Sequence, residues 1–173
     1  MKERRRGSYD LFYDTFESPL GTLYLIVAGK VLREIDFRKP ADIPRKDVAS
    51  HLLKKELREY FEHGKDEFTQ QIDPANGTEF ERIVWFTLRE IPFGETRTYK
   101  WLAEKIGKPN ASRAVGQALG KNPLPIILPC HRIIESDGSL GGYSGGIDIK
   151  RRLLEMEYYM RMAKKTDPST GSG

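Results

Sequence analysis

Cys130 is the one cysteine of the chain, and it stands in the segment Pro129-Cys130-His131-Arg132. Nearby positive charge lowers the pKa of a thiol, and the thiolate is the form that attacks carbon. Neighbouring side chains of a strand point to opposite faces, so His131 can assist only if the backbone turns here or a water bridges the pair. The segment predicts an activated nucleophile. The alternative is a buried cysteine that behaves as a small hydrophobic residue.

Two flanking segments frame this cysteine. Residues 122–134 carry three prolines around an apolar stretch, which predicts an extended, stiff chain before Cys130. Residues 138–146 form a glycine-rich loop that does not follow a strand in the dinucleotide-binding pattern. Its glycines allow the backbone to close around a flat ligand, with Tyr143 stacking and Ser144 donating a hydrogen bond. A flexible surface loop is the alternative.

The first half of the chain has the pattern of a small sheet with one covering helix. Residues 11–16, 22–28 and 31–37 are short runs rich in β-branched and aromatic residues, separated by turn signals. Residues 48–63 carry apolar side chains at helical spacing and end before Gly64. Residues 71–77, which include Asp-Pro and Asn-Gly, are the expected domain boundary.

The second half is mostly helical. Residues 78–90 begin with Thr78 and have Glu81 three positions later, which is a capping-box pattern. Thr98 caps the next expected helix, which ends before Gly107, and residues 111–119 form another. A long helix is expected over residues 148–165, on which Glu157 either reaches inward or is solvated.

Two short helices joined by a tight turn indicate a helix-turn-helix. The second helix is rich in small residues, and Arg113 is its only charge, so it can approach a nucleic-acid groove closely. Residues 91–165 hold 13 basic and 7 acidic side chains, whereas residues 8–90 hold 12 and 16. A polyanion is therefore expected to bind the C-terminal half. An ordinary packed helix pair with a random charge imbalance is the alternative.

Composition excludes several classes of protein. One cysteine permits no internal disulfide and no cysteine-rich zinc site, and His51 and His63 lie among charged residues. No apolar run approaches the roughly 20 residues that cross a bilayer. These features favour a reducing, intracellular setting. Residues 1–7 read as a basic arm, and residues 166–173 read as a flexible tail.

Several of these motifs together resemble one family. The residues are Asn122-Pro-x-Pro, Pro129-Cys130-His131-Arg132-Ile133, and Tyr143-Ser144-Gly145-Gly146 followed by Lys150. They are similar to the O6-alkylguanine-DNA alkyltransferases, or methylated-DNA–protein-cysteine methyltransferases. The likeness runs from about Phe80 to Glu157, whereas residues 8–77 match only in kind.

The resemblance implies an α+β fold. A small β-sheet and helix domain over residues 1–77, a ribonuclease H-like roll, would serve as a scaffold. A mostly helical winged helix-turn-helix domain over residues 78–165 would bind DNA and carry the transfer site.

The resemblance also implies a catalytic set. Cys130 would accept the alkyl group, His131 would deprotonate it through a bound water, and Glu157 would orient and polarise His131. Asn122 would hold the two halves of the site together. Tyr99 would crowd the phosphate of the target nucleotide and donate to the flipped base.

The implied binding residues lie on the loop and on the second helix of the helix-turn-helix. Tyr143 and Ser144 would contact guanine, with Gly145 beside them, and the backbone carbonyls of Cys130 and Ile133 would read its exocyclic amine. Arg113 would fill the gap left in the duplex as this helix enters the minor groove. Its neighbours at the DNA would be Ser112, Ala114 and Gly116.

The implied function is repair by base flipping and one irreversible transfer per molecule, since a thioether is a poor leaving group. The partner would be double-stranded DNA with O6-alkylguanine. No cofactor, metal, membrane or obligate protein partner is expected, and the protein would be a cytoplasmic or nucleoid-associated monomer. A related non-enzymatic branch carries tryptophan at the cysteine position, and Cys130 argues against it. The rivals are a non-catalytic DNA-binding regulator, which leaves Cys130 idle, and a cysteine hydrolase, which does not explain the helix-turn-helix.

Overall fold

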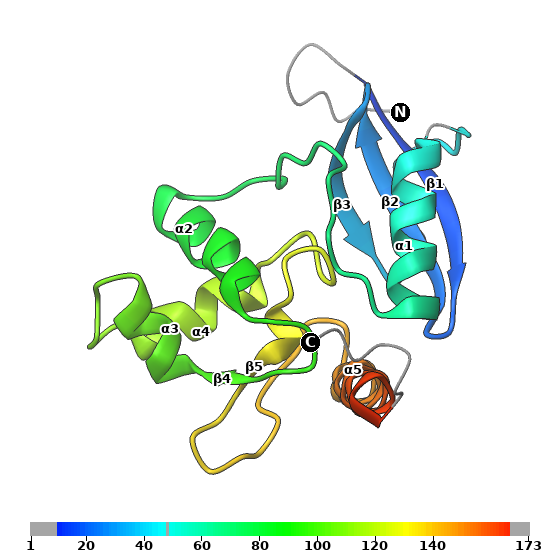
Figure 1. Ribbon diagram of the computed structural model, residues 1–173. Helices are drawn as coiled ribbons and strands as arrows, with labels where there is room; N and C mark the ends of the chain where they lie inside the picture. Colours follow the sequence, from blue (N-terminus) through cyan, green and yellow to red (C-terminus); the bar gives the residue numbers. More distant parts are fainter. Residues whose placement is uncertain (1–9, 48, 167–173) are drawn as a thin grey trace.

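The computed structural model of the chain describes residues 10–47 and 49–166. The expected basic arm and residues 167–173 of the expected tail lie outside the described residues. An antiparallel sheet in the order β1-β2-β3 opens the fold (Figure 1). The strands are β1 (Leu11–Ser18), β2 (Gly21–Ala28) and β3 (Val31–Asp36). All three match the expected strands to within two residues at each end.

Helix α1 (His51–His63) packs on one face of this sheet (Figure 1). The Ser50 side chain accepts a hydrogen bond from the Leu53 N–H, and this cap starts the helix three residues later than expected. Gly64 closes the helix with a φ of 64°, a left-handed conformation that glycine adopts without strain. The helix therefore presents Leu57, Tyr60 and Phe61 as a buried stripe.

The C-terminal half begins with α2 (Glu79–Thr87), which continues as the 3-10 turn η1 (Leu88–Glu90). The Thr78 and Glu81 side chains each accept the other residue's backbone N–H, so the expected capping box is confirmed. The elements that follow are β4 (Arg97–Thr98), α3 (Tyr99–Lys105), α4 (Ser112–Gly120), η2 (Cys130–Arg132), β5 (Ile133–Ile134) and α5 (Ile147–Thr166).

Helices α3 and α4 form the expected helix-turn-helix. Thr98 caps α3 by accepting a hydrogen bond from the Trp101 N–H, and Gly107 makes the turn with a φ of 78°. Trp85 of α2 donates its indole N–H to the carbonyl of Ala118 in α4 at 2.7 Å. This buried bond fixes α4 against the rest of the domain.

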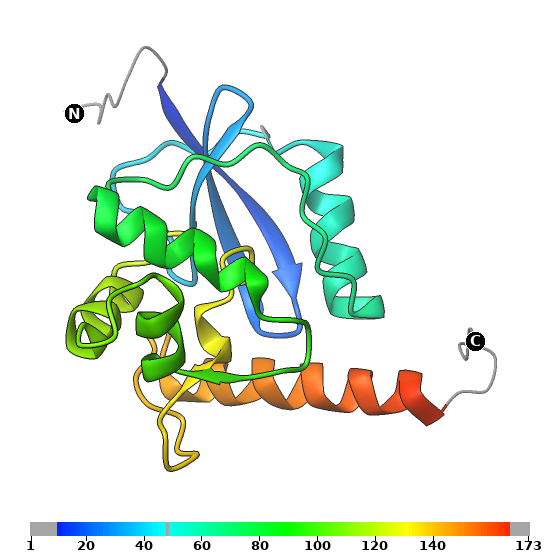
Figure 2. The same ribbon diagram turned by 60° about the vertical axis from the view of Figure 1, so that its left-hand side comes forward.

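One hydrophobic core joins the two halves of the chain. Leu25 of β2, Tyr60 of α1, Trp85 of α2 and Leu102 of α3 belong to the same buried cluster. The Ile35 N–H at the edge of β3 donates to the carbonyl of Pro123 at 2.9 Å. Helix α5 runs along one side of the molecule (Figure 2). The α+β architecture is as expected.

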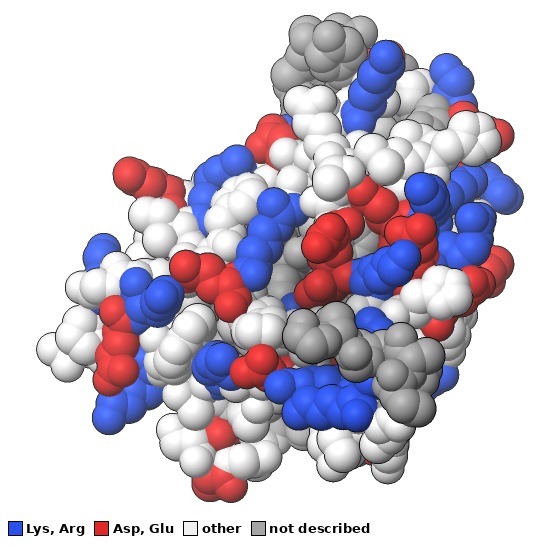
Figure 3. All heavy atoms as spheres, in the orientation of Figure 1, with Lys and Arg blue, Asp and Glu red and all other residues white. Residues whose placement is uncertain are grey.

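Charge does not single out one side of the face drawn in Figure 3, where basic and acidic side chains are interspersed. His51 and His63, which lie among charged residues of the sequence, are exposed. Across the described ranges, no helix combines the length and the apolar composition needed to span a bilayer.

Candidate active site

A pocket of about 560 Å³ opens between the helix-turn-helix and the glycine-rich loop. Cys130 lies in its wall, and Tyr99 of α3 and Tyr143 of the loop line it as well. The other lining residues that the sequence singled out are Ser112, Arg113, Gly116 and Ser144. The fold thus brings one nucleophile, two aromatic side chains and one cation to a single opening.

The backbone turns at Cys130, as the neighbouring histidine requires. Cys130 begins the 3-10 turn η2, and its N–H donates to the carbonyl of Leu128 at 2.8 Å. The expected extended chain before it is wrong. The Leu128 N–H donates back to Leu124 at 2.9 Å, and Ile126 has a φ of 76°. The prolines stiffen a compact turn instead of an extended segment.

Asn122 accounts for that compact turn. Its amide nitrogen donates to the Leu128 carbonyl at 2.8 Å, and its amide oxygen accepts from the Leu124 N–H at 3.0 Å. A single buried side chain therefore closes the loop on both sides. The same side chain is hydrogen-bonded to Cys130. Asn122 joins the loop to the nucleophile.

The thiol is held in its protonated form. Burial raises the pKa of Cys130 to about 11, although Asn122 and Lys150 act in the opposite direction. The expected net lowering of this pKa by adjacent positive charge is wrong, because burial outweighs the effect of Lys150 and the Arg132 guanidinium is paired with Glu157 and Asp66. At neutral pH the thiol therefore needs a base.

His131 is placed to be that base. Its Nε2 lies 2.7 Å from Oε1 of Glu157, and both side chains are buried. A neutral histidine in this arrangement donates from Nε2, which leaves Nδ1 as an acceptor. Among the described residues, Nδ1 has no hydrogen-bond partner. His131, which follows Cys130 in the chain, therefore offers Nδ1 as a free acceptor.

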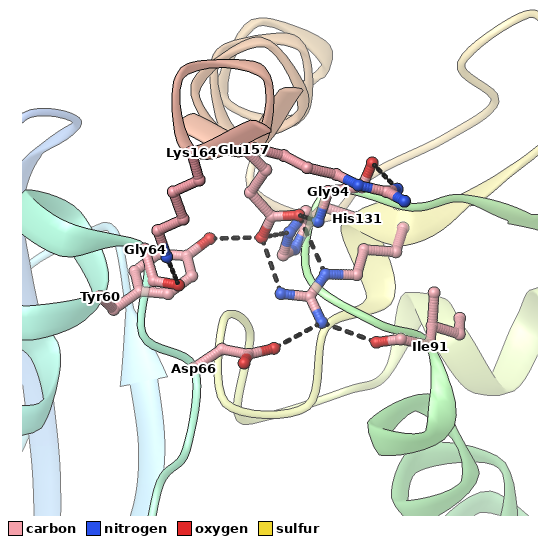
Figure 4. A network of polar contacts seen from close by, with 10 residues as sticks. Tyr60, Gly64, Asp66, Ile91, Gly94, His131, Glu157 and Lys164 are labelled. Atoms are coloured by element: carbon pink, nitrogen blue, oxygen red, sulfur yellow. Dashed lines mark hydrogen bonds and ion pairs between the residues drawn. The ribbon is translucent and has the colours of Figure 1, made fainter. Parts of the chain in front are cut away.

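Glu157 points inward and is the centre of a polar network (Figure 4). Its Oε1 accepts from the Tyr60 hydroxyl at 2.7 Å and from Nη2 of Arg132 at 2.9 Å, in addition to His131. Its Oε2 accepts from Nε of Arg132 at 3.0 Å and from the Gly94 N–H at 3.4 Å. Burial raises the pKa of the Glu157 carboxyl, but the facing His131 and Arg132 outweigh burial and hold it well below its usual range. Glu157 is a carboxylate throughout the physiological range.

Two tyrosines complete the pocket. Burial, and then the nearby Glu135 and Cys130, raise the pKa of Tyr99, so its hydroxyl remains a donor. Tyr143 has a half-exposed ring but an enclosed hydroxyl, which lacks a hydrogen-bond partner among the described residues. Its pKa is raised well above the usual value by burial and then by Cys130 and Glu157. Both phenols stay protonated beside the thiol.

Lys150 fixes the glycine-rich loop. This fully buried ammonium donates to the carbonyl of Ile133 at 2.6 Å and to that of Gly142 at 3.2 Å. The Ile133 carbonyl, expected to read guanine, is thus already bonded to Lys150, and the Cys130 carbonyl accepts the Ile133 N–H. Each carbonyl oxygen keeps one further lone pair for a ligand.

Besides the buried Ile133, two predicted binding residues lie outside the pocket wall. Ala114 is exposed on α4, and Gly145 faces Phe37, which follows β3. A β-carbon at Gly145 would lie 2.7 Å from the Phe37 ring, so only glycine permits this approach. The sequence analysis missed Phe37 and Tyr60, since neither stands near a motif. In the part of the chain that the structure describes, no three His, Cys, Asp or Glu side chains gather to hold a metal ion.

Two family models match the chain. Residues 11–74 match the ribonuclease-like domain of 6-O-methylguanine DNA methyltransferase, and residues 79–159 match its DNA-binding domain. The methylated-DNA–protein-cysteine methyltransferase of Methanosarcina barkeri is 45% identical over 154 residues, which cover 85% of this chain and 97% of that protein. The protein of the same name from Mycobacterium tuberculosis is 42% identical, with 85% and 92% covered.

Solved structures agree with the sequence matches. The crystal structure of the O6-methylguanine methyltransferase of Mycobacterium tuberculosis has a TM-score of 0.79 and 40% identity, with 87% of this chain and 94% of that one covered. The Mycobacterium tuberculosis protein in complex with DNA has a TM-score of 0.80 and 41% identity, with 86% and 94% covered. The likeness spans both halves of the fold.

Proposed function

The chain belongs to the 6-O-methylguanine DNA methyltransferase family, and from that premise we propose that Cys130 is the residue that accepts the alkyl group. The family reaction moves a methyl group from DNA to a cysteine of the protein itself. The observation that carries the proposal is that the one cysteine of the chain lies in the wall of a pocket bordered by the helix-turn-helix.

The thiolate forms when His131 removes the thiol proton. Nδ1 accepts the thiol proton by way of a water, because the two side chains make no direct hydrogen bond in this arrangement. The Glu157 carboxylate, 2.7 Å from Nε2, stabilises the imidazolium that results. The relay is needed because burial raises the pKa of the Cys130 thiol to about 11, which leaves it protonated at neutral pH.

The transfer itself is a displacement at the alkyl carbon. A bond forms between the Cys130 sulfur and that carbon, while the bond from the carbon to guanine O6 breaks. The electron pair of the broken bond stays on O6, and the departing guanine needs a proton or hydrogen-bond donors. The Tyr99 hydroxyl and Ser144 line the pocket and are groups of that type. The product is a thioether, so each molecule reacts once.

DNA is the partner of this family, and double-stranded DNA with O6-alkylguanine is the substrate we assign to this chain. O6 lies inside the base stack, so the nucleotide must leave the helix to reach Cys130. Arg113, exposed at the pocket and near the start of α4, is placed to occupy the space left in the duplex. Ser112 and Gly116 lie on the same side of the helix, and no obligate protein partner is invoked.

The cellular setting follows from the chemistry. Cys130 must remain a free thiol, which favours a reducing compartment that contains DNA, namely the cytoplasm or nucleoid. The domain limits we assign are residues 1–77 for the scaffold and 78–165 for the transfer domain.

The test uses duplex DNA that carries O6-methylguanine with a labelled methyl group. After incubation, the protein is digested and the peptide that contains Cys130 is examined by mass spectrometry. We expect one label per molecule on Cys130 and none on Cys130→Ala. Label on Cys130→Ala would overturn the assignment, and DNA binding without transfer would indicate a regulator.

A further inference from the structure

Among the described residues of the N-terminal half, Tyr60 is the one that forms a hydrogen bond with Glu157. The two residues are 97 positions apart, and the hydroxyl donates to Oε1 at 2.7 Å (Figure 4). Tyr60 is fully buried in the last turn of α1, and its ring packs edge-on against Phe93 at 5.9 Å. The end of the same helix is held to α5 by Lys164, whose ammonium donates to the carbonyl of Gly64 at 3.3 Å. The hydroxyl is therefore held in place from both sides.

We infer that Tyr60 is a positioning residue of the proton relay, and that its hydrogen bond to Glu157 limits how strongly His131 holds a proton. The inference rests on the function proposed above. It gives the N-terminal half a direct part in the reaction, beyond that of a scaffold.

The argument starts from the shared oxygen. Tyr60 and His131 both bond to Oε1 of Glu157, each at 2.7 Å. A donor on a carboxylate oxygen takes up part of its negative charge. The charge that remains is what stabilises the imidazolium of His131. Removing the Tyr60 hydroxyl leaves more charge for His131, so the imidazolium becomes more stable.

The other groups around Glu157 also affect how much negative charge its carboxylate offers to His131. Arg132 of η2 gives two hydrogen bonds and is itself paired with Asp66 at 3.0 Å. The Gly94 N–H donates a longer hydrogen bond to Oε2 of Glu157 at 3.4 Å. Tyr143, in the glycine-rich loop, interacts electrostatically with the Glu157 carboxylate. These contacts remain when the Tyr60 hydroxyl is removed, so the change isolates one donor.

Tyr60 itself does not titrate in the working range. Burial, and then the Glu157 charge, raise its pKa well above the usual value. The hydroxyl is thus a constant donor, and any pH effect of removing it must appear through the relay.

The experiment compares Tyr60→Phe with wild type over about pH 5 to about pH 9, using the labelled duplex. Neutral His131 is the active base, so the transfer rate falls on the acid side. We expect Tyr60→Phe to move the midpoint of this fall to higher pH by about half a unit to one unit, which is roughly a three- to tenfold slower reaction well below the midpoint. The rate on the alkaline plateau should change by less than about threefold, since general-base efficiency varies gradually with basicity.

Tyr13→Phe is the matched control, because Tyr13 is a buried tyrosine of β1 that packs on Tyr24. It should leave the midpoint unchanged. A Tyr60→Phe profile that is scaled down without a shift would overturn the inference and reduce Tyr60 to a packing role. Wild type that places no label on Cys130 would instead overturn the proposed function.

A measurement on wild type covers the case in which Tyr60→Phe does not fold. The hydroxyl proton of Tyr60, buried and bonded to a carboxylate, should give a slowly exchanging resonance in nuclear magnetic resonance spectra. We expect this resonance to move in a pH titration across the acid side of the rate profile, because the Tyr60 hydroxyl and His131 share Oε1. A resonance that stays fixed through that titration would refute the coupling.

Discussion

Glu157→Gln tests the polar network most directly, because this change keeps the shape of the side chain and removes its charge. Glu157 is 1% exposed and accepts hydrogen bonds from Tyr60, His131, Arg132 and the Gly94 N–H. The new amide presents N–H groups to some of these donors. The buried Arg132 guanidinium then keeps only one ionised partner, Asp66.

The size of the effect follows from the loss of one of the two carboxylates that face the buried Arg132 guanidinium. Removing one partner of a buried ion pair costs about 3–5 kcal/mol of unfolding free energy. For a chain of this length, the melting temperature should fall by about 6 to 20 °C. Glu155→Gln, an exposed change on the same helix, should stay within about 0.5 kcal/mol of wild type. Urea denaturation followed by circular dichroism measures both variants.

The pH dependence has a definite sign. The folded-state pKa of Glu157 lies below its unfolded value. Such a group stabilises the fold above its unfolded-state pKa and loses that effect as pH falls through the folded-state pKa. The difference in unfolding free energy between wild type and Glu157→Gln should be constant from about pH 5 to about pH 8. It should become smaller below about pH 4, where the carboxyl of the unfolded wild-type chain takes up a proton.

A double-variant cycle separates the ion pair from other effects. Glu157→Gln combined with Arg132→Met removes both charges, so the combined loss should be smaller than the sum by at least about 1 kcal/mol. A loss of unfolding free energy below about 1 kcal/mol for Glu157→Gln, or a loss that Glu155→Gln equals, would refute the reasoning, since breaking a buried ion pair costs more than that.

Three other changes probe the pocket and its loop. Arg113→Ala should slow repair of duplex DNA at least about tenfold more than reaction with free O6-methylguanine, measured by label transfer, because only the duplex requires base flipping. Gly145→Ala should cost about 1–3 kcal/mol in urea unfolding through its clash with Phe37, whereas Gly142→Ala, which meets nothing within 4 Å, should not. Lys150→Met should also cost about 1–3 kcal/mol, because the buried Ile133 carbonyl and the Gly142 carbonyl lose their donor, and transfer should slow. A Lys150→Met protein as stable and as fast as wild type would contradict this role.

Local signals made most of the fold predictable from the sequence. Thr78 with Glu81, and Thr98, start helices through contacts that span three residues, so their effect is visible in a short window. The segment before Cys130 was different. Its prolines limit φ but do not fix the direction of the chain, and a side chain outside the apolar stretch, Asn122, folds it into a turn.

The candidate site was predictable only where its residues stand within a motif. Tyr99, Tyr143 and Ser144 lie in the pocket with Cys130, as the resemblance implied. Tyr60 carries no such signal, because its partner lies 97 positions away and a tyrosine at helical spacing predicts only burial. Long-range hydrogen bonds between buried side chains depend on tertiary packing, which sequence periodicity does not report.

The contrast between Arg132 and His131 explains how the thiol is controlled. Arg132 follows Cys130 by two positions, yet its charge is neutralised by Glu157 and Asp66 and does little to ionise the sulfur. At pH 7 a thiol with a pKa of about 11 is ionised in about one molecule in ten thousand. Such a thiol is a poor nucleophile, and in the proposed relay His131 takes its proton. Because each molecule has one cysteine, a buried thiol that is activated only through the proposed relay would favour transfer from a bound base over reaction with alkylating agents in solution.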